Sequence, residues 1–276
     1  MFNCPPEVIP DYIARQLPAG DAFEQIMALK GTVYRDMLGR RTIQVSLGDE
    51  SYFVKQHFGV GWAEIFKNLL MLRLPIISAA TEWRAIHRLN ELGIPTTPGV
   101  AYACRGHNPA RMQSFVMTKD LGDIISLETL CAGWKSNPPD ANFKRQLILA
   151  VARMARTFHD NGMNHRDFYL CHFCLDKPRL AKGEIYLYLI DLHRVGIRRQ
   201  IKPAARIKDI AGLYFSAMDA GLSKKDILRF IRTYRGGLRE ALLMESNFLQ
   251  AVDARARKLY EKIHQRAAVT PFDIND

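Results

Sequence analysis

Hydrophobic and polar positions along this 276-residue chain predict strands near its beginning and helices further on. Two runs rich in β-branched and aromatic residues, 41–47 and 51–55, flank a Gly-Asp pair and predict a β-hairpin. A third such run, 184–190, predicts a buried strand. Apolar residues three and four positions apart predict amphipathic helices at 80–92 and 143–161, and a glycine follows each segment. This mixture indicates an α+β protein.

The last third of the chain is predicted to be helical. Ser223 and Asp226 have the spacing of a capping box, which opens a helix that runs through Tyr234. Another helix is expected to begin at Asp209, and a long one to run from 238 to about 266. Helices packed on one another are therefore expected to form most of this part.

The segment 62–77 is unusual because it is both strongly apolar and basic. Only a few polar residues interrupt its large apolar side chains. A helix packed in the protein interior is the favoured interpretation, because apolar stretches in globular chains usually belong to the core. Two alternatives stay open: contact with a membrane surface, and docking of a protein partner.

The candidate chemistry is concentrated in a His-Arg-Asp motif, 165–167, and in Asp191, which follows 24 residues after Asp167. Phosphoryl transfer needs one carboxylate to orient the acceptor hydroxyl and another to hold Mg²⁺ against the phosphates of ATP. Asp167 is the candidate for the first role and Asp191 for the second. Protein kinases place Asn five residues after this aspartate, where the present chain has His172.

Lys55 and Glu82 complete the set. Lys55 ends a predicted strand, from which it would reach the α- and β-phosphates of ATP, and Glu82 in a predicted helix is expected to pair with it. Taken singly, each residue is more typical of an ordinary surface charge. Lys, Glu, Asp and Asp in the order of protein kinases, each on the right kind of element, favour a phosphotransferase.

At this level of detail the chain resembles a known family, the bacterial lipopolysaccharide core kinases that act on the first heptose. The resemblance covers nearly the whole chain, and the stretches that carry it are 51–55, 82–89, 164–167, 171–173, 190–194 and 208–216. It implies ATP-dependent phosphorylation of a heptose hydroxyl in the inner core, at the cytoplasmic side of the inner membrane. It also implies a two-lobed protein-kinase-like fold, with a small β-rich lobe at 1–118 and a larger helical lobe at 119–276.

The resemblance assigns further roles. Adenine would contact the backbone near Met117 and Lys119, at the last strand and hinge of the small lobe. His172 is a poor metal ligand, because Mg²⁺ prefers oxygen ligands. It would bond to Asp167 or to a phosphate, bind metal weakly, or be a packed histidine with no catalytic duty. Asp209 would brace the backbone of the catalytic loop, and His165 would support the same loop.

Phosphate binding is the weakest kinase feature. The segment 30–41 lies where protein kinases have a glycine-rich loop, but it lacks the G-x-G-x-x-G pattern. Arg40 or Arg41 is expected to supply the positive charge that backbone amides supply elsewhere.

The charge balance indicates acidic partners. The chain has 39 Lys+Arg against 28 Asp+Glu, a formal net charge of +11. Part of the excess follows Asp191, in Arg194, Arg198, Arg199, Lys202, Arg206 and Lys208. This position favours an anionic acceptor such as the lipopolysaccharide core, with an anionic membrane or an acidic protein as further partners. No nucleic-acid-binding motif is present, so nucleic acid is not expected.

No apolar run approaches the roughly 18 residues that span a bilayer, and no signal peptide is recognisable. A cytoplasmic protein, peripheral on the inner membrane, is therefore expected. Its five cysteines should then be reduced. Cys171 and Cys174 form a lone CxxC pair, for which packing beneath the catalytic loop is favoured over zinc binding.

Other functions stay open. The nearest is a kinase acting on another core sugar, Kdo, or on protein hydroxyls. An alternative of another class is a pseudokinase that binds nucleotide or acidic lipid as a scaffold. The missing glycine motif and His172 permit a pseudokinase, whereas Lys55, Glu82, Asp167 and Asp191 oppose it.

Overall fold

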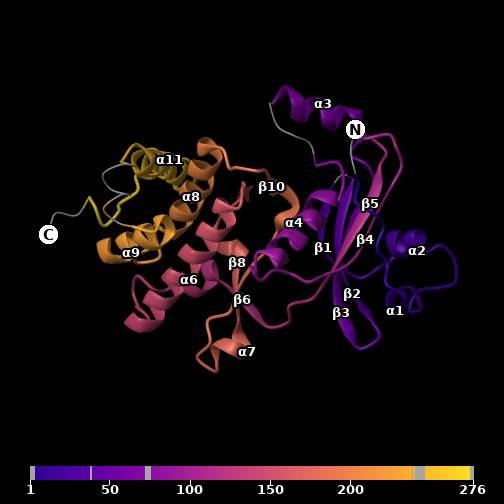
Figure 1. The fold of residues 1–276 in the computed structure, drawn as a ribbon, viewed down its shortest axis with the longest axis horizontal. Coiled ribbons are helices and arrows are strands. Elements are labelled where there is room, and N and C mark those ends of the chain that lie inside the picture. Colours follow the sequence, from indigo (N-terminus) through magenta and orange to yellow (C-terminus); the bar gives the residue numbers. More distant parts are fainter. Residues whose placement is uncertain (1–3, 38, 72–75, 238, 240–245, 274–276) are drawn as a thin grey trace. The chain divides into compact units, whose positions relative to one another are not determined.

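The structure, a computed structural model, describes residues 4–37, 39–71, 76–237, 239 and 246–273. It consists of two compact units. The N-terminal unit comprises the chain up to Glu91 together with Thr96–Gly122 and Asp191–Arg194. The C-terminal unit comprises Leu92–Pro95, Asp123–Ile190 and the chain from Val195 onward. A five-stranded antiparallel sheet in the first unit and helices in the second confirm the α+β class (Figure 1).

The N-terminal unit is built on one sheet with the strand order β1-β2-β3-β5-β4. Its elements are α1 (Asp11–Ala14), α2 (Ala22–Ala28), β1 (Thr32–Met37), β2 (Arg40–Leu47), β3 (Glu50–His57), α3 (Gly61–Leu70), α4 (Ala80–Glu91), β4 (Gly99–Arg105), β5 (Gln113–Lys119) and the short 3-10 helix η2 (Leu192–Arg194). The predicted hairpin is confirmed as β2 and β3, and the predicted helix 80–92 as α4.

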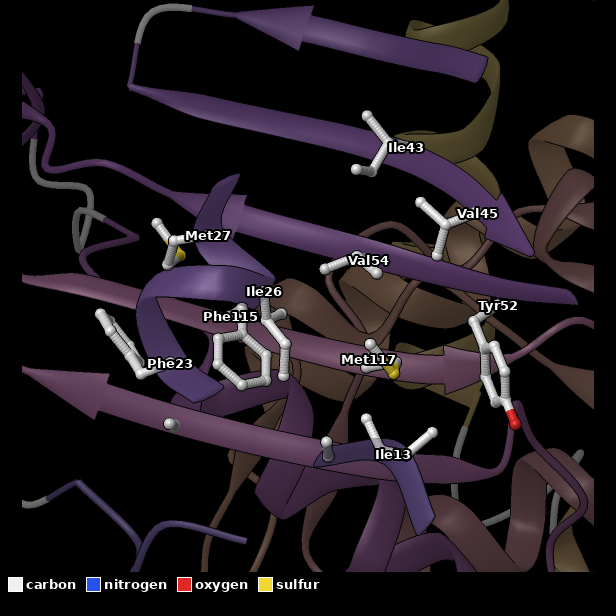
Figure 2. Close-up of a cluster of buried hydrophobic side chains, with 12 residues drawn as sticks. Ile13, Phe23, Ile26, Met27, Ile43, Val45, Tyr52, Val54, Phe115 and Met117 are labelled. Carbon is white, nitrogen blue, oxygen red and sulfur yellow. The ribbon is translucent and has the colours of Figure 1, made fainter. Parts of the chain in front are cut away.

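One face of this sheet carries the hydrophobic core of the unit. Side chains from α1 and α2 pack there against alternate residues of β2, β3 and β5. Figure 2 shows Phe23 and Ile26 of α2 beside Phe115, and the Phe23 and Phe115 ring centroids are 5.8 Å apart. Because successive residues of a strand point to opposite faces, the core position of Val54 directs Lys55 to the other face.

The C-terminal unit combines helices with two small sheets, of order β6-β8-β9 and β10-β7. Its elements are β6 (Ile124–Ser126), α5 (Leu127–Cys131), α6 (Ala141–Asp160), β7 (Met163–Asn164), the 3-10 helix η1 (Leu170–His172), β8 (Phe173–Asp176), α7 (Lys177–Leu180), β9 (Leu187–Leu189), β10 (Gly196–Ile197), α8 (Pro203–Ala217), α9 (Lys224–Arg235) and α11 (Ser246–His264). The strand predicted at 184–190 is shorter than expected, since β9 pairs with β8 only from Leu187 to Leu189.

The predicted helices of this unit are present, with changed ends. The expected capping box is complete on α9, where Ser223 and Asp226 form it, and Asp140 accepts the N–H groups at the start of α6. The expectation that a helix begins at Asp209 is wrong, because Pro203 starts α8 six residues earlier. The long helix predicted from 238 is described from Ser246, and 238 and 240–245 lie outside the described residues.

The expectation that 62–77 packs in the interior is wrong for α3, whereas Ile77 at the end of the segment is buried. In α3 only Ile65 is buried. Five large apolar side chains along it are exposed by 48–86 %: Trp62, Phe66, Leu69, Leu70 and Met71. Residues 72–75 lie outside the described residues. No described helix is long and apolar enough to cross a membrane.

The cysteines depart from a fully reduced set. Cys4 and Cys104 form a disulfide, so the expectation that all five are reduced is wrong. Cys171 and Cys174 are free thiols, and Cys174 is buried in β8. Burial raises the pKa of Cys174 to about 11, which disfavours the thiolate that zinc would need.

The helices of the C-terminal unit line a partly open apolar cavity of about 410 Å³. Its walls include Leu147 and Val151 of α6, Leu213 of α8 and Val252 of α11. None of the predicted site residues lines it.

Candidate active site

Lys55 lies at the centre of the charged face of the N-terminal sheet. Its Nζ donates a hydrogen bond to Oε1 of Glu82 at 2.6 Å and lies 3.6 Å from Oδ1 of Asp191. The contact between Lys55 and Glu82 that the sequence predicted is therefore present. The fold also places Asp191 beside Lys55, although the two residues are far apart in the chain.

Burial strengthens the interactions between the charged groups of this cluster. Glu82 is 3 % exposed, in the first turn of α4, and its second oxygen is buried without a hydrogen-bond partner among the described residues. Burial disfavours the charged ammonium of Lys55, but the carboxylates of Glu82 and Asp191 outweigh it and raise the pKa of Lys55. Lys55 is therefore a permanent cation with two carboxylates beside it.

Asp191 is held in an unusual backbone conformation. Its φ is 61°, in the left-handed region that residues other than glycine rarely adopt. The described chain has three such residues, and two of them, Arg166 and Asp191, belong to the predicted motifs. Strained backbone of this kind clusters at functional sites. The Nδ1 of His193 lies 2.6 Å from Oδ1 of Asp191 and orients its carboxylate.

The catalytic loop is fixed within the C-terminal unit by Asp209. This buried carboxylate accepts the backbone N–H of His165 at 2.6 Å and of Arg166 at 2.8 Å. Its oxygen Oδ2 also lies 3.3 Å from Nε2 of His159. The bracing contact implied by the sequence is therefore present, and it comes from the middle of α8.

Two histidines complete the support of this loop. Nε2 of His165 lies 2.9 Å from the carbonyl oxygen of Ile190, the residue before Asp191 in the chain. Nδ1 of His172 lies 2.6 Å from the backbone carbonyl of Asp167, so this nitrogen must carry the proton and donate it. The bond that the sequence suggested between His172 and Asp167 is made to the backbone. The proposed catalytic role of the Asp167 carboxylate stays a prediction.

The two residues predicted to lie near adenine, Met117 and Lys119, have other contacts and are not part of the charged cluster. The side chain of Met117 is fully buried in the sheet core (Figure 2). Lys119 pairs with Glu50, and its backbone N–H donates to the carbonyl of Pro98. That amide is already bonded within the unit. Adenine binding by this segment stays a prediction.

Sequence reasoning missed His57 and His193 and left Arg40 and Arg41 undecided. Arg40 and His57 line a small cavity of about 60 Å³ together with Lys55, Glu82 and Asp191. The signal for them was strand periodicity, because Arg40 pairs with His57, and Thr42 with Lys55, in the β2–β3 register. Even-numbered residues of β2 therefore share the face of Lys55, and Arg41 also lines the cavity.

The residues present fit Mg²⁺ only in part. Among the described residues, no group of three or more His, Cys, Asp or Glu is arranged to hold a metal ion. Mg²⁺ needs fewer protein ligands, since it is usually held by one or two carboxylates, phosphates and water. The carboxylate of Asp191, partly exposed beside Lys55, is a donor of this kind.

Protein-kinase-like phosphotransferases need a lysine held by a glutamate and a fixed loop around the catalytic aspartate. Both are present, each within its own unit, and they place this fold in that class. The chain belongs to the lipopolysaccharide kinase (Kdo/WaaP) family, whose family model matches residues 24–234.

Curated relatives agree with this membership. The chain is 47 % identical over 245 residues to the lipopolysaccharide core heptose(I) kinase WaaP of Pseudomonas aeruginosa, covering 88 % of this chain and 91 % of that one. It is 44 % identical over 248 residues to the protein of the same name from Escherichia coli K12, covering 89 % and 94 %.

A solved structure described as WaaP in complex with acyl carrier protein is 42 % identical, with a TM-score of 0.79, and covers 93 % of this chain and all of that one. The resemblance inferred from sequence and the α+β kinase-like fold are thereby confirmed.

Proposed function

We propose that this chain is an ATP-dependent heptose(I) kinase of the lipopolysaccharide inner core. The observation that carries the proposal is the Lys55–Glu82 bond of 2.6 Å beside Asp191, on a chain 44–47 % identical to proteins named as heptose(I) kinases. A pseudokinase scaffold would not need this ionic arrangement to be complete.

Each residue has a distinct role in the proposed reaction. Lys55 binds phosphate oxygens of ATP, and Glu82 keeps the lysine in place. Asp167 orients the heptose hydroxyl and takes up its proton as the oxygen attacks the γ-phosphorus and the bond to the β-phosphate breaks. Asp191 would hold Mg²⁺, which supplies charge neutralisation on the phosphates when bound.

The basic residues after the metal-binding aspartate support an anionic acceptor. Arg198, Arg199 and Lys202 are exposed, whereas Arg206 is paired with Asp160 at 2.9 Å. The three exposed cations are free to attract a phosphorylated or otherwise acidic glycolipid.

An acceptor comparison tests the proposal. Purified protein with ATP and Mg²⁺ is given core lipopolysaccharide lacking heptose phosphate, a protein substrate, or no acceptor, and ADP release is measured. Mass spectrometry of the glycolipid then assigns the phosphate to heptose or to Kdo. Phosphate on heptose I supports the proposal, phosphate on Kdo or protein redirects it to another kinase, and no transfer to any acceptor favours a pseudokinase.

We also propose that α3 binds the membrane that carries the acceptor, at its cytoplasmic face. The rings of Trp62 and Phe66 stack with centroids 5.8 Å apart, and Leu70 is 86 % exposed. Tryptophan next to aliphatic side chains on one helix suits the interface of a bilayer, and the net charge of +11 suits anionic lipid.

Flotation with vesicles containing anionic lipid tests this surface. The double variant Trp62→Ser/Leu70→Ser should lose most of the bound fraction. Ile263→Ser, which removes one exposed apolar side chain from α11, is the matched control and should bind as the unaltered protein does. Equal loss in both variants would contradict a specific role for α3.

A relative forms a complex with acyl carrier protein, and we propose the same partner for this chain. The apolar cavity of about 410 Å³ among the helices of the C-terminal unit has the character of a site for an alkyl chain. Mass spectrometry of the purified protein should detect the carrier with an acyl group. Val151→Trp, which fills the cavity, should release it, and retention of the acylated carrier would contradict the proposal.

A further inference from the structure

The charged face of the N-terminal sheet carries more cations than the Lys55–Glu82–Asp191 cluster uses. In the strand register, Arg40 lies opposite His57, and Arg35 lies opposite Thr42, which in turn is opposite Lys55. Alternation therefore directs Arg35 and Arg40 to the same face as Lys55. All of these residues line the small charged cavity.

The positive charge at this cavity is not balanced. The carboxylates of Glu82 and Asp191 both face Lys55, and Arg41 pairs with Asp36 at 3.0 Å. Neither Arg35 nor Arg40 forms an ion pair with a carboxylate of the described residues. Burial, followed by the nearby charge of Arg35, lowers the pKa of Arg40 below its usual value. Glu64 and Asp191 act on Arg40 in the opposite direction but from beyond ion-pair distance. Two neighbouring guanidinium groups, neither ion-paired to a carboxylate, form a site that an anion would stabilise.

His57 provides an independent observation. The residue is 4 % exposed, and its buried Nδ1 has no hydrogen-bond partner among the described residues. Burial, reinforced by the charges of Arg40, Lys55 and His193, lowers its pKa to about 3, so the ring is neutral at physiological pH. A buried polar atom without a partner is costly, and the ring that carries it lines the cavity.

Local backbone geometry explains how Arg40 is placed. Gly39 precedes it with φ of 75°, and a Cβ there would lie 2.3 Å from the carbonyl oxygen of Gly59. The N–H of Phe58 also donates to the carbonyl of Gly39 at 2.8 Å. This close approach fixes the end of the β1–β2 hairpin against the chain after β3, so that Arg40 begins β2 directly beside the cavity.

We infer that Arg40, assisted by Arg35 and placed beside the neutral ring of His57, binds the terminal phosphates of the nucleotide in place of the backbone amides of a glycine-rich loop. The inference rests on the proposed function for the identity of the anion as ATP. It accounts for the absence of a G-x-G-x-x-G pattern in 30–41. A side-chain guanidinium makes bidentate bonds to phosphate and needs no glycine backbone.

Calorimetric titration of the full chain with ATP, ADP and AMP tests the inference. The unaltered protein should bind ATP and ADP more tightly than AMP. Arg40→Gln should weaken ATP and ADP binding by roughly ten- to a hundredfold, the range for one lost bond to a charged group, and leave AMP unchanged. Arg40→Lys should have intermediate affinities, because lysine keeps the positive charge but cannot make the two parallel N–H bonds of a guanidinium group.

Arg88→Gln is the matched control. It removes one positive charge from an exposed i,i+3 pair on α4 and should leave all three affinities unchanged. Equal weakening of AMP and ATP by Arg40→Gln, unchanged ATP affinity, or no nucleotide binding by the unaltered protein would overturn the inference. Circular dichroism checks folding, and Arg35→Gln decides by the same readout if the Arg40 variant is unfolded.

The same variants separate this inference from the proposed function. If Arg40 governs the preference for ATP and ADP but no heptose is phosphorylated, the phosphate site stands and the function is wrong. If heptose is phosphorylated by Arg40→Gln with an unchanged KM for ATP, the function stands and the phosphate site is wrong.

Discussion

The carboxylate of Asp209 accepts the backbone N–H of Arg166 at 2.8 Å, and Arg166 has a left-handed φ of 73°. A buried acceptor on α8 therefore stabilises a conformation that arginine rarely adopts. The arrangement links the stability of the helix to the shape of the loop that carries Asp167.

Replacement of that acceptor should loosen the loop. Asp209→Asn is expected to lower the free energy of unfolding by about 1–3 kcal/mol, because one of the two backbone N–H groups loses its acceptor inside the protein. Phosphate transfer should fall as well. Urea unfolding and ADP release measure the two effects, and an unchanged activity in the destabilised variant would mean that the loop is fixed by other contacts.

Loss of Lys55 should affect stability as well as activity. Lys55→Met leaves the buried carboxylate of Glu82 without its cation, and we expect a cost of about 2–3 kcal/mol. This is below the range for fully buried pairs because the side chain of Lys55 is 26 % exposed and water screens it.

The double variant Lys55→Met/Glu82→Leu separates the two effects. It should recover most of the stability, since no buried charge remains, but none of the activity. Thermal or urea unfolding beside the kinase assay tests this, and recovery of activity would contradict the role given to Lys55.

Asp167→Ala should abolish phosphate transfer without unfolding the protein. The bond from His172 goes to the Asp167 backbone carbonyl, which alanine keeps. Loss of the carboxylate should reduce kcat by at least about 100-fold, the usual contribution of a general base. Normal turnover in this variant would refute the assignment, and circular dichroism verifies the fold.

Stability should decrease as the pH falls below neutral. Burial lowers the pKa of His57 from 6.5 to about 3, and burial also lowers the pKa of His159. Below about pH 6.5 these two histidines therefore bind protons in the unfolded chain but stay neutral in the folded protein. Each histidine reduces the free energy of unfolding by up to about 1.4 kcal/mol per pH unit between pH 6.5 and its folded pKa.

Urea unfolding at pH 7.5, 6.0 and 5.0 measures this slope. His57→Gln should make the slope shallower, whereas replacement of the exposed His107 should not change it. If the His57 variant shows the same slope of unfolding free energy against pH as the unaltered protein, His57 does not contribute to that slope.

Local patterns predicted much of the fold. The hairpin, α4, α6 and the capping box of α9 follow from spacing that the chain makes visible within a few residues. The sequence prediction places the start of α8 too late, because Asp209 lies inside the helix and Pro203 occupies its first turn. The predicted burial of α3 is wrong, because an apolar run in the sequence does not reveal whether other parts of the protein cover it.

The order of the kinase motifs along the chain predicts the part of the candidate site that these motifs contribute. Lys55 and Glu82 pair as expected, since strand and helix positions imply the side on which each lies. The choice between Arg40 and Arg41 depended on which face of β2 each occupies, and the disulfide of Cys4 with Cys104 depended on tertiary proximity. Strand alternation carries the first kind of information, whereas sequence spacing does not carry the second.

The pairing of β2 with β3 has a consequence for how this protein can vary. The two strands are joined by the short turn at Gly48 and Asp49, and that turn sets which residues lie opposite each other. Insertion of one residue there would turn Arg40 away from the face that carries Lys55 and turn Ile43 out of the core. Turn length at the far end of the hairpin is therefore expected to be as invariant among functional homologues as the charged residues themselves.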